Sequence, residues 1–307
     1  MNNRRKFIKQ SGLGVLGFSL LPQISFAKQD DVRITILHTN DMHSHIHPFT
    51  SGRNKGLGGM AQRAGLIKSI REKEEHVLLL DAGDIFQGTP YFNFYGGELE
   101  LKLMSAMKYD AATLGNHDFD NGLEGLQKQF HHAEFPFLIA NYDFTETILK
   151  DKFKPYKIFN KGGVKIGVFG IGIELDGLVP KKLYANTVYQ DPIERANHYT
   201  SLLKKKEKCD LIICLSHLGL KYKTNKISDL KFASKTRDID LIIGGHTHTF
   251  LKKPISILNI EKKETLINQV GWGGINLGQI DFHFSQNQGI KKVFGSSIFV
   301  KSNTKNA

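Results

Sequence analysis

The chain has 307 residues, of which 40% are hydrophobic and 23% are charged, and its formal net charge is +12. This length excludes a mini-protein and allows a large buried core. No run of roughly 18 apolar residues follows residue 27, so no membrane span is expected there. The lysines are scattered, and the longest run, at residues 204–206, falls in a predicted helix. A solvated helix face explains that run, and no nucleic-acid partner is expected.

The first 27 residues have the order of a secretory signal. Arg4, Arg5 and Lys6 precede a mild apolar stretch at residues 11–21, and small residues follow up to Ala27. That order predicts a signal peptide at residues 1–27, and the paired arginines resemble a twin-arginine signal. We expect export by that route to the periplasm or cell envelope. Retention of the segment as a membrane anchor is the alternative.

Residues 32–131 alternate short apolar runs with helix-like stretches. Strands are predicted at residues 34–37, 77–80 and 111–114, and helices at residues 60–74, 98–107 and 123–131. The apolar runs are nearly continuous, which is typical of strands that are buried on both faces of a mixed or parallel sheet. The aromatic stretch at residues 91–95 is predicted as a loop that lines a cleft or packs in the core.

The rest of the chain changes character twice. Runs at residues 156–159 and 165–171 flank an Asn-Lys-Gly-Gly turn and predict a hairpin. A helix at residues 192–206, strands at 211–215 and 241–243, and a helix between them follow. Four final runs, at residues 254–260, 265–270, 278–284 and 293–299, predict an antiparallel finish. A single α/β domain with two packed sheets accommodates this order.

Metal-capable side chains follow the ends of five predicted strands. The candidate ligands are Asp41, His43, Asp84, Asn116, His217, His246 and His248. Open α/β sheets place their ligands at the carboxyl ends of strands. Taken singly, each residue fits a turn or a structural hydrogen bond. Taken together, they form a set of nitrogen and oxygen donors that suits Zn, Mn or Fe.

The number of candidate ligands predicts two ions. A catalytic zinc commonly takes three protein ligands and a water. Seven ligands with one bridging carboxylate would give each of two ions four protein contacts. Two ions about 3.5–4 Å apart are suited to phosphate chemistry.

The five blocks, in this order, resemble those of the calcineurin-like metallophosphoesterase superfamily. The blocks at residues 39–45 and 114–122 are most similar to the N-terminal catalytic domain of the 5′-nucleotidase and UDP-sugar hydrolase branch. The resemblance implies a four-layer αββα sandwich, in which two mixed sheets are flanked by helices.

The resemblance also implies a role for each site residue. The first ion would be held by Asp41, His43 and His248, the second by Asn116, His217 and His246, and Asp84 would bridge the two. His117 would face the substrate phosphate, where it would stabilise charge on the phosphate or protonate the leaving oxygen, with Asp120 orienting its ring. Asn116 could contact the phosphate as well as its ion. His45 is expected to be structural, and Gln87 is given no ligand role.

The implied activity is an exported hydrolase for phosphate monoesters, specifically 5′-nucleotides, with a metal-activated water as nucleophile. Its expected partner is a small phosphoester in nucleotide catabolism. Residues 28–307 are expected to form one domain, without the nucleoside-binding C-terminal domain of the family. A separate chain that supplies that domain is a partner left open.

Three other functions are compatible with the sequence. One is a phosphodiesterase or sulfate-ester hydrolase of the same superfamily. Another is a non-catalytic metal-binding subunit of an envelope complex, which the presence of His117 and Asp120 beside all candidate ligands disfavours. The last is a structural envelope protein, for which such a ligand set has no use. A nicotinamide cofactor is not expected, because the only G-x-G-x-x-G run lies within the signal, at residues 12–17.

Overall fold

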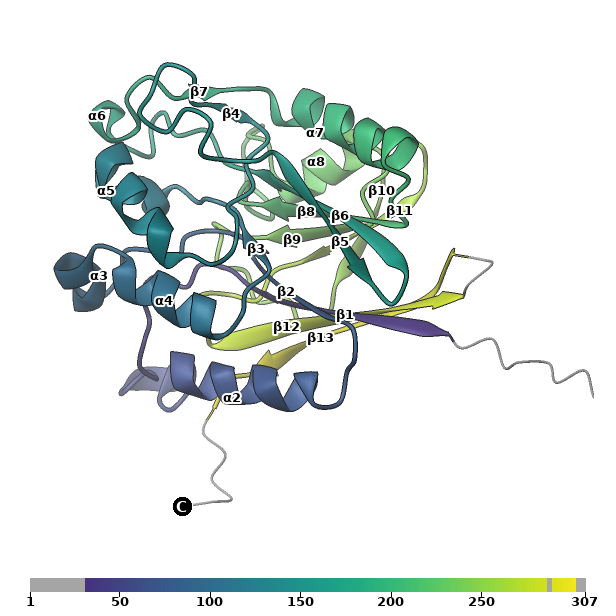
Figure 1. The fold of residues 1–307 in the computed structure, drawn as a ribbon, viewed down its shortest axis with the longest axis horizontal. Coiled ribbons are helices and arrows are strands. Elements are labelled where there is room, and N and C mark those ends of the chain that lie inside the picture. The colour runs from purple at the N-terminus through teal and green to yellow at the C-terminus, as the bar shows by residue number, and fades with distance from the viewer. Residues whose placement is uncertain (1–30, 286–288, 302–307) are drawn as a thin grey trace, which may run out of the picture.

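The computed structural model describes residues 31–285 and 289–301. The predicted signal peptide therefore lies outside the described residues. Two sheets pack face to face, and helices cover the outer face of each (Figure 1). Among the described residues, no helix combines the length and the apolar character needed to cross a lipid bilayer.

The first sheet has the strand order β13-β12-β1-β2-β3. Its strands are β1 (Val32–Thr39), β2 (Val77–Asp81), β3 (Ala111–Ala112), β12 (Asn276–Ser285) and β13 (Gly289–Phe299). The second sheet has the order β10-β11-β9-β8-β6-β5. Its strands are β5 (Tyr156–Lys161), β6 (Val164–Ile171), β8 (Leu211–Ser216), β9 (Leu241–Gly244), β10 (Ile255–Leu258) and β11 (Glu264–Asn268). A small two-stranded sheet pairs β4 (Tyr142–Asp143) with β7 (Val188–Tyr189).

The helices divide between the two sheets nearly in chain order. Those of the first half are α2 (Met60–Arg71), α3 (Pro90–Tyr95), α4 (Glu98–Ala106) and α5 (Gly122–Gln129). Those of the second half are α6 (Lys181–Tyr184), α7 (Pro192–Ser201) and α8 (Asp229–Lys235). The exception to the order is α6, which packs beside α5, with Tyr184 in the cluster under the first-sheet helices. Short 3₁₀ turns are η1 (Gly52–Asn54), η2 (His117–Phe119) and η3 (Phe130–His132), and a π turn, η4 (Leu202–Lys206), extends α7. In Figure 1, α2 and α4 lie on one side of the paired sheets, and α7 and α8 on the other.

The alternation of buried side chains explains the layers. Leu78 and Leu80 of β2 belong to the apolar cluster between the two sheets, whereas Val77 and Leu79 belong to the cluster under α2 and α4. Successive strand side chains point to opposite faces, so a continuous apolar run serves two cores. A third cluster packs the second sheet against α7 and α8. Three cores between four layers confirm the α/β sandwich that the sequence predicts.

Parallel pairing brings the five loops to one edge of the sandwich. In the first sheet β1 pairs with β2 and β2 with β3, and in the second sheet β6 pairs with β8 and β8 with β9, all in parallel. The carboxyl ends of these strands therefore lie on the same side of their sheets. The loops after them carry all of the candidate ligands.

Several sequence predictions need correction. The aromatic stretch 91–95 is not a loop but most of α3, which begins at Pro90 in the first turn and ends at Gly96 in the left-handed conformation. Only Phe92 of that stretch is buried, while Phe94 is 82% exposed. The last four strands are not one antiparallel unit, because β11 pairs in parallel with β9 and β12–β13 complete the other sheet. The strand predicted at 111–114 is shorter, ending at Ala112.

Candidate metal centre

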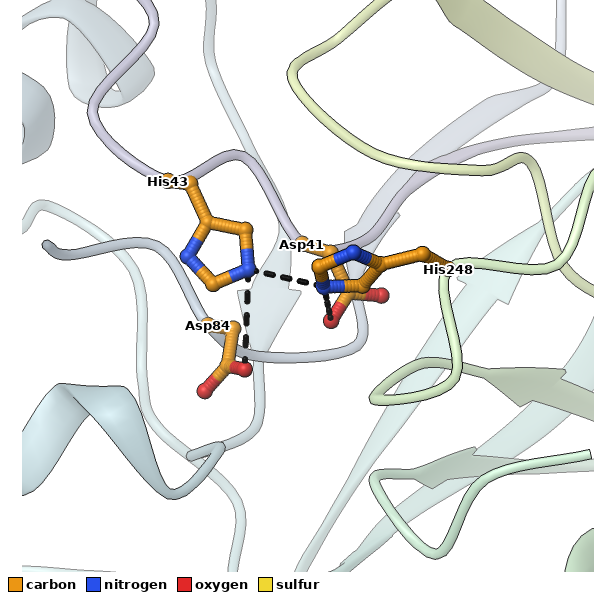
Figure 2. Close-up of side chains that lie close together, drawn as sticks. All are labelled: Asp41, His43, Asp84 and His248. Carbon is orange, nitrogen blue, oxygen red and sulfur yellow. Dashed lines mark hydrogen bonds and ion pairs between the residues drawn. The ribbon is translucent and has the colours of Figure 1, made fainter. Parts of the chain in front are cut away.

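Four of the five loops converge so that their side chains form two groups able to hold a cation. The first contains Asp41, His43, Asp84 and His248, and the second contains Asp84, His217 and His246. Within each group the ligand atoms lie within 4.8 Å of one another. Figure 2 shows the first group, in which dashed lines join His43 to Asp84 and to His248, and His248 to Asp41. Asp84 is the one side chain that belongs to both groups.

Asp84 divides its two carboxylate oxygens between different tasks. Its Oδ1 accepts a hydrogen bond from the backbone N–H of His117 at 2.8 Å. Its Oδ2 lies 3.1 Å from Nε2 of His217 and 3.8 Å from Nε2 of His43. A Cβ on Gly115 would overlap Oδ1, so this close approach requires glycine. One oxygen thus fixes the carboxylate, and the other faces a histidine of each group.

Asp41 connects the loops after β1 and β9. Its carboxylate accepts the backbone N–H of His246 at 2.9 and 3.0 Å. Its Oδ1 lies 3.4 Å from Nε2 of His248 and 3.9 Å from Nε2 of His217. The neighbouring Asn40 donates from its side chain to Asp41 at 2.6 Å. These bonds hold the carboxylate toward the first group.

Asn116 adds an amide oxygen to the second group, and two histidines meet within the first. Oδ1 of Asn116 lies 2.8 Å from Nδ1 of His246. In the first group, Nε2 of His43 and Nε2 of His248 are 2.9 Å apart. All seven predicted ligand side chains therefore lie at this one centre.

The backbone of the site is strained at the residues that carry these side chains. Five of the seven candidate ligands have positive φ angles: Asp41 (50°), His43 (47°), Asp84 (56°), His246 (69°) and His248 (51°). Non-glycine residues in this region cost about 1–3 kcal/mol each and persist where surrounding structure enforces them. Strained residues of this kind are common at functional sites. Here the tight turns in which they occur direct the ligand side chains toward the centre.

His217 shows that the centre requires positive charge. Its Nδ1 donates to the Ala82 carbonyl at 2.7 Å, so in the neutral ring Nε2 carries a lone pair. That buried Nε2 has no hydrogen-bond partner within the described residues, although Oδ2 of Asp84 lies close by. A lone pair and a carboxylate oxygen repel each other unless a proton or a cation lies between them. The residues present therefore fit a divalent ion.

The pKa values of the buried groups express the same requirement. Burial lowers the pKa of His217, but the Asp84 carboxylate outweighs this and raises it to about 10. Burial raises the pKa of Asp84, yet the charge on His217 outweighs it and holds that pKa below its usual range. Burial, helped by the neighbouring His217, lowers the pKa of His246 to about 4. The buried carboxylates therefore stabilise a nearby positive charge, which is either a bound cation or the proton on His217.

His117 lies at the rim of the centre. Its ring centroid is 5.4 Å from that of His43, and its side chain is 37% exposed. Nδ1 lies 2.9 Å from Oδ2 of Asp120, so the hydrogen bond to Asp120 uses Nδ1 and not Nε2. The hydrogen bond to Asp120 raises the pKa of His117 above its usual value. The pairing of His117 with Asp120 that the sequence predicts is present in the structure.

Asp118, to which the sequence analysis gave no role, organises the loop that carries Asp84. Its buried carboxylate accepts the backbone N–H groups of Gly115 (2.7 Å), Asp84 (3.0 Å), Ile85 (2.9 Å) and Phe86 (3.1 Å). Those partners are up to 34 residues away along the chain, so no local pattern reveals them. The only signal in the sequence is an acidic residue directly beside His117.

The remaining histidines belong to neither group among the described residues. His45 stacks on Phe49, with ring centroids 4.5 Å apart, which agrees with its predicted structural role. His38, which the sequence analysis passed over, is buried between the sheets and contacts Asn268 at 2.9 Å. Burial lowers the pKa of His38 to about 3, so it is a neutral core residue.

Comparison with known proteins identifies the family of this fold and site. A family model for calcineurin-like phosphoesterases matches residues 34–250. The chain belongs to the calcineurin-like phosphoesterase family.

Three proteins illustrate the likeness. Over 71% of the chain it is 40% identical to the snake venom 5′-nucleotidase of Crotalus adamanteus, and over 75% it is 38% identical to the 5′-nucleotidase of Vibrio cholerae. The crystal structure of a 5′-nucleotidase precursor from Thermus thermophilus superposes with a TM-score of 0.77 and 30% identity over 88% of the chain. The chain covers 37%, 43% and 55% of these three proteins, about half of their length or less.

Replacing Asp118 with asparagine should loosen the centre. The amide NH₂ of Asp118→Asn would face two backbone N–H groups that now donate to a carboxylate oxygen. Leaving buried donors without acceptors costs about 1–3 kcal/mol each. We expect a lower urea midpoint and weaker metal retention than in the wild type. Both are measured by urea unfolding and elemental analysis.

A matched control is Asp191→Asn. Asp191 also accepts one backbone N–H, from Glu194 at the start of α7, but it is exposed. Asparagine caps helices as well as aspartate does, so this variant should keep wild-type stability and metal content. Equal metal retention in Asp118→Asn and wild type would contradict the role of Asp118.

Proposed function

We propose that the chain is a phosphomonoesterase that binds two divalent ions and acts on 5′-nucleotides. The observation that carries this proposal is the placement of Asp84, whose Oδ2 faces a histidine of each ligand group. The relatives named above are 5′-nucleotidases, which supports the same substrate class.

The proposed division of ligands follows the two groups. Asp41, His43 and His248 would hold the first ion, and Asn116, His217 and His246 the second, while Asp84 would contact both. The donors are imidazole nitrogens and carboxylate or amide oxygens, which suit Zn, Mn or Fe. When bound, a pair of such ions lowers the pKa of water and offsets the charge of a phosphate group.

His117 would act on the substrate rather than on an ion. Oδ2 of Asp120 accepts the proton on Nδ1, so the ring presents Nε2. A raised pKa favours the protonated ring, and Nε2–H can donate to a phosphate oxygen or to the leaving oxygen. Asp120 keeps the ring in that tautomer and orientation. Transfer of the Nε2 proton to the leaving alkoxide would yield a neutral alcohol.

Export and partners are part of the proposal. Residues 1–27, outside the described residues, would direct the chain through the twin-arginine route to the periplasm or cell envelope. Residues 28–307 would form the catalytic domain. A small phosphoester would be the substrate.

A substrate panel tests the proposed function. The purified chain, loaded with Mn²⁺ or Zn²⁺, should release phosphate from 5′-nucleotides faster than it cleaves cyclic nucleotides, UDP-sugars or aryl phosphodiesters. Chelation should abolish turnover, and added metal should restore it, because the two buried carboxylates require cations. Phosphate release from the monoesters is measured by a colorimetric assay, and cleavage of the diesters and UDP-sugars, which frees no inorganic phosphate, by chromatographic separation of the products. Failure to hydrolyse any phosphomonoester in the metal-loaded state would refute the proposal.

Alanine at His117 tests the role of the rim histidine. His117→Ala should lower kcat by about 10²–10⁴, the usual contribution of a general acid. Its metal content should stay at the wild-type value, because His117 belongs to neither ligand group. The exposed His131 supplies the matched control, since His131→Ala should change neither quantity. Wild-type turnover in His117→Ala would remove His117 from the reaction.

A further inference from the structure

Trp272, the single tryptophan of the chain, lies against one of the proposed ligands. Its ring and that of His248 are nearly parallel, with an interplanar angle of 16° and centroids 5.8 Å apart. Neither the proposed ligand set nor the proposed proton transfer gives this contact a role.

His248 is held less firmly than the other proposed histidine ligands. Nδ1 of His217 is bonded to a backbone carbonyl, and the ring of His246 packs edge to face on that of His217, with centroids 5.4 Å apart. His43 lacks such a bond on Nδ1, but its side chain is only 7% exposed. The side chain of His248 is 40% exposed. Within the described part of the chain, the contacts of its ring nitrogens all involve Nε2, toward His43 and Asp41 (Figure 2).

This difference matters because a histidine ligand needs a fixed ring. Metal-bound histidines almost always use their second nitrogen to hold tautomer and orientation. His248 has no such hydrogen bond among the described residues and little burial. Two rings pack against it, that of His43 edge to face with centroids 4.9 Å apart and the stacked indole of Trp272, and of these only the indole is not itself a proposed ligand.

Trp272 is itself fixed by two aromatic neighbours. The His45 ring meets it edge to face with centroids 5.3 Å apart, and the Phe49 ring does so at 5.4 Å. Edge-to-face geometry is a favourable arrangement for aromatic pairs. His45, Phe49 and Trp272 thus form a small aromatic brace beside the first ligand group.

Backbone bonds tie the Trp272 loop to two of the three ligand loops of the first group. Gly271 donates to the Thr249 carbonyl at 2.9 Å, directly beside His248. Gly273 donates to the Asp41 carbonyl at 2.7 Å. Both glycines have positive φ angles, and a Cβ on either one would overlap a phenylalanine ring. The indole is therefore placed relative to Asp41 and His248 at once.

We propose that Trp272 is a positioning residue that holds the imidazole of His248 in its ligating orientation and so sets the affinity of the first ion position. The inference rests on the proposed metal pair. It has a second consequence: the intrinsic fluorescence of the chain reports occupancy of the first position, because the sole indole lies against one of its ligands. The second position does not depend on Trp272, since His217 has a backbone hydrogen-bonding partner and His246 packs against His217.

Metal content of two tryptophan variants tests the proposal. Loss of a partner that orients a ligand typically weakens metal affinity 10–100-fold. After dialysis at limiting free Mn²⁺, Trp272→Ala should retain one ion per chain while the wild type retains two. Trp272→Phe, which keeps a stacking ring, should bind the first ion more tightly than the alanine variant. Circular dichroism verifies that both variants are folded.

The control variant is Phe250→Ala. Phe250 is 44% exposed and belongs to the same pair of loops, and its ring lies beside Gly271. It should keep both ions. If Phe250→Ala loses an ion as readily as Trp272→Ala, the effect is general loosening of the loops and the proposal fails. Unchanged affinity for both ions in Trp272→Ala also overturns it.

Fluorescence supplies a readout that needs no turnover. Titrating the metal-free wild type with Co²⁺, a paramagnetic quencher, should quench the emission of Trp272 until the first position is filled. His248→Ala should shift that quenching to at least 10-fold higher Co²⁺, whereas His217→Ala should keep it near the wild-type midpoint. Equal midpoints in wild type and His248→Ala would contradict the proposal. Because neither assay involves a substrate, failure to hydrolyse nucleotides would refute the proposed function without deciding this inference.

Discussion

Two buried carboxylates, Asp41 and Asp84, determine which side chains the rest of the site must contain. They are 0% and 1% exposed, and within the described residues their recorded ion-pair partners are histidines rather than lysine or arginine. Uncompensated charge is costly in a protein interior, so such a pair requires cations. The raised pKa of His217 shows that these carboxylates also stabilise a proton on the neighbouring imidazole. The strained turns and the converging histidines place ligands for such cations around the two carboxylates.

The architecture makes this concentration of charge possible. Parallel strands of two different sheets end at one edge, and each ends in a turn that aims a side chain inward. Apolar layers on both faces of both sheets fix those strand ends firmly enough to hold strained residues in place. Asp118 then ties together the loops after β2 and β3 through four backbone N–H groups. Rigidity supplied by the core is thus transmitted to the ligands through buried hydrogen bonds.

Much of this arrangement follows from local sequence. Strand cores such as residues 77–80 show as apolar runs, and each candidate ligand follows its strand within a few residues. The loop predicted at residues 91–95 is helical instead and forms most of α3, although Pro90 and Gly96 mark the first turn and the end of that helix. The parallel pairing of β11 with β9 could not be predicted from the local sequence, because pairing depends on which partner strand has an unpaired edge in the finished sheet.

Supporting residues were beyond local reasoning for a different reason. Asp118 and Trp272 act through contacts with segments that are distant in sequence, and nothing in their neighbours announces those contacts. Gln269 is similar, since its side chain accepts the backbone N–H of Thr249, 20 residues away. Ligands can be inferred from residue type and placement, whereas the residues that orient them become visible only when the loops are assembled.

The central claim is that one oxygen of Asp84 is shared between two cations. Anomalous diffraction from crystals soaked in Mn²⁺ tests it most directly, because each ion gives its own peak. The account predicts two peaks about 3.5–4 Å apart, one on the side of His43 and one on the side of His217, with Oδ2 of Asp84 between them. A single peak, or two peaks of which only one contacts Asp84, would contradict it.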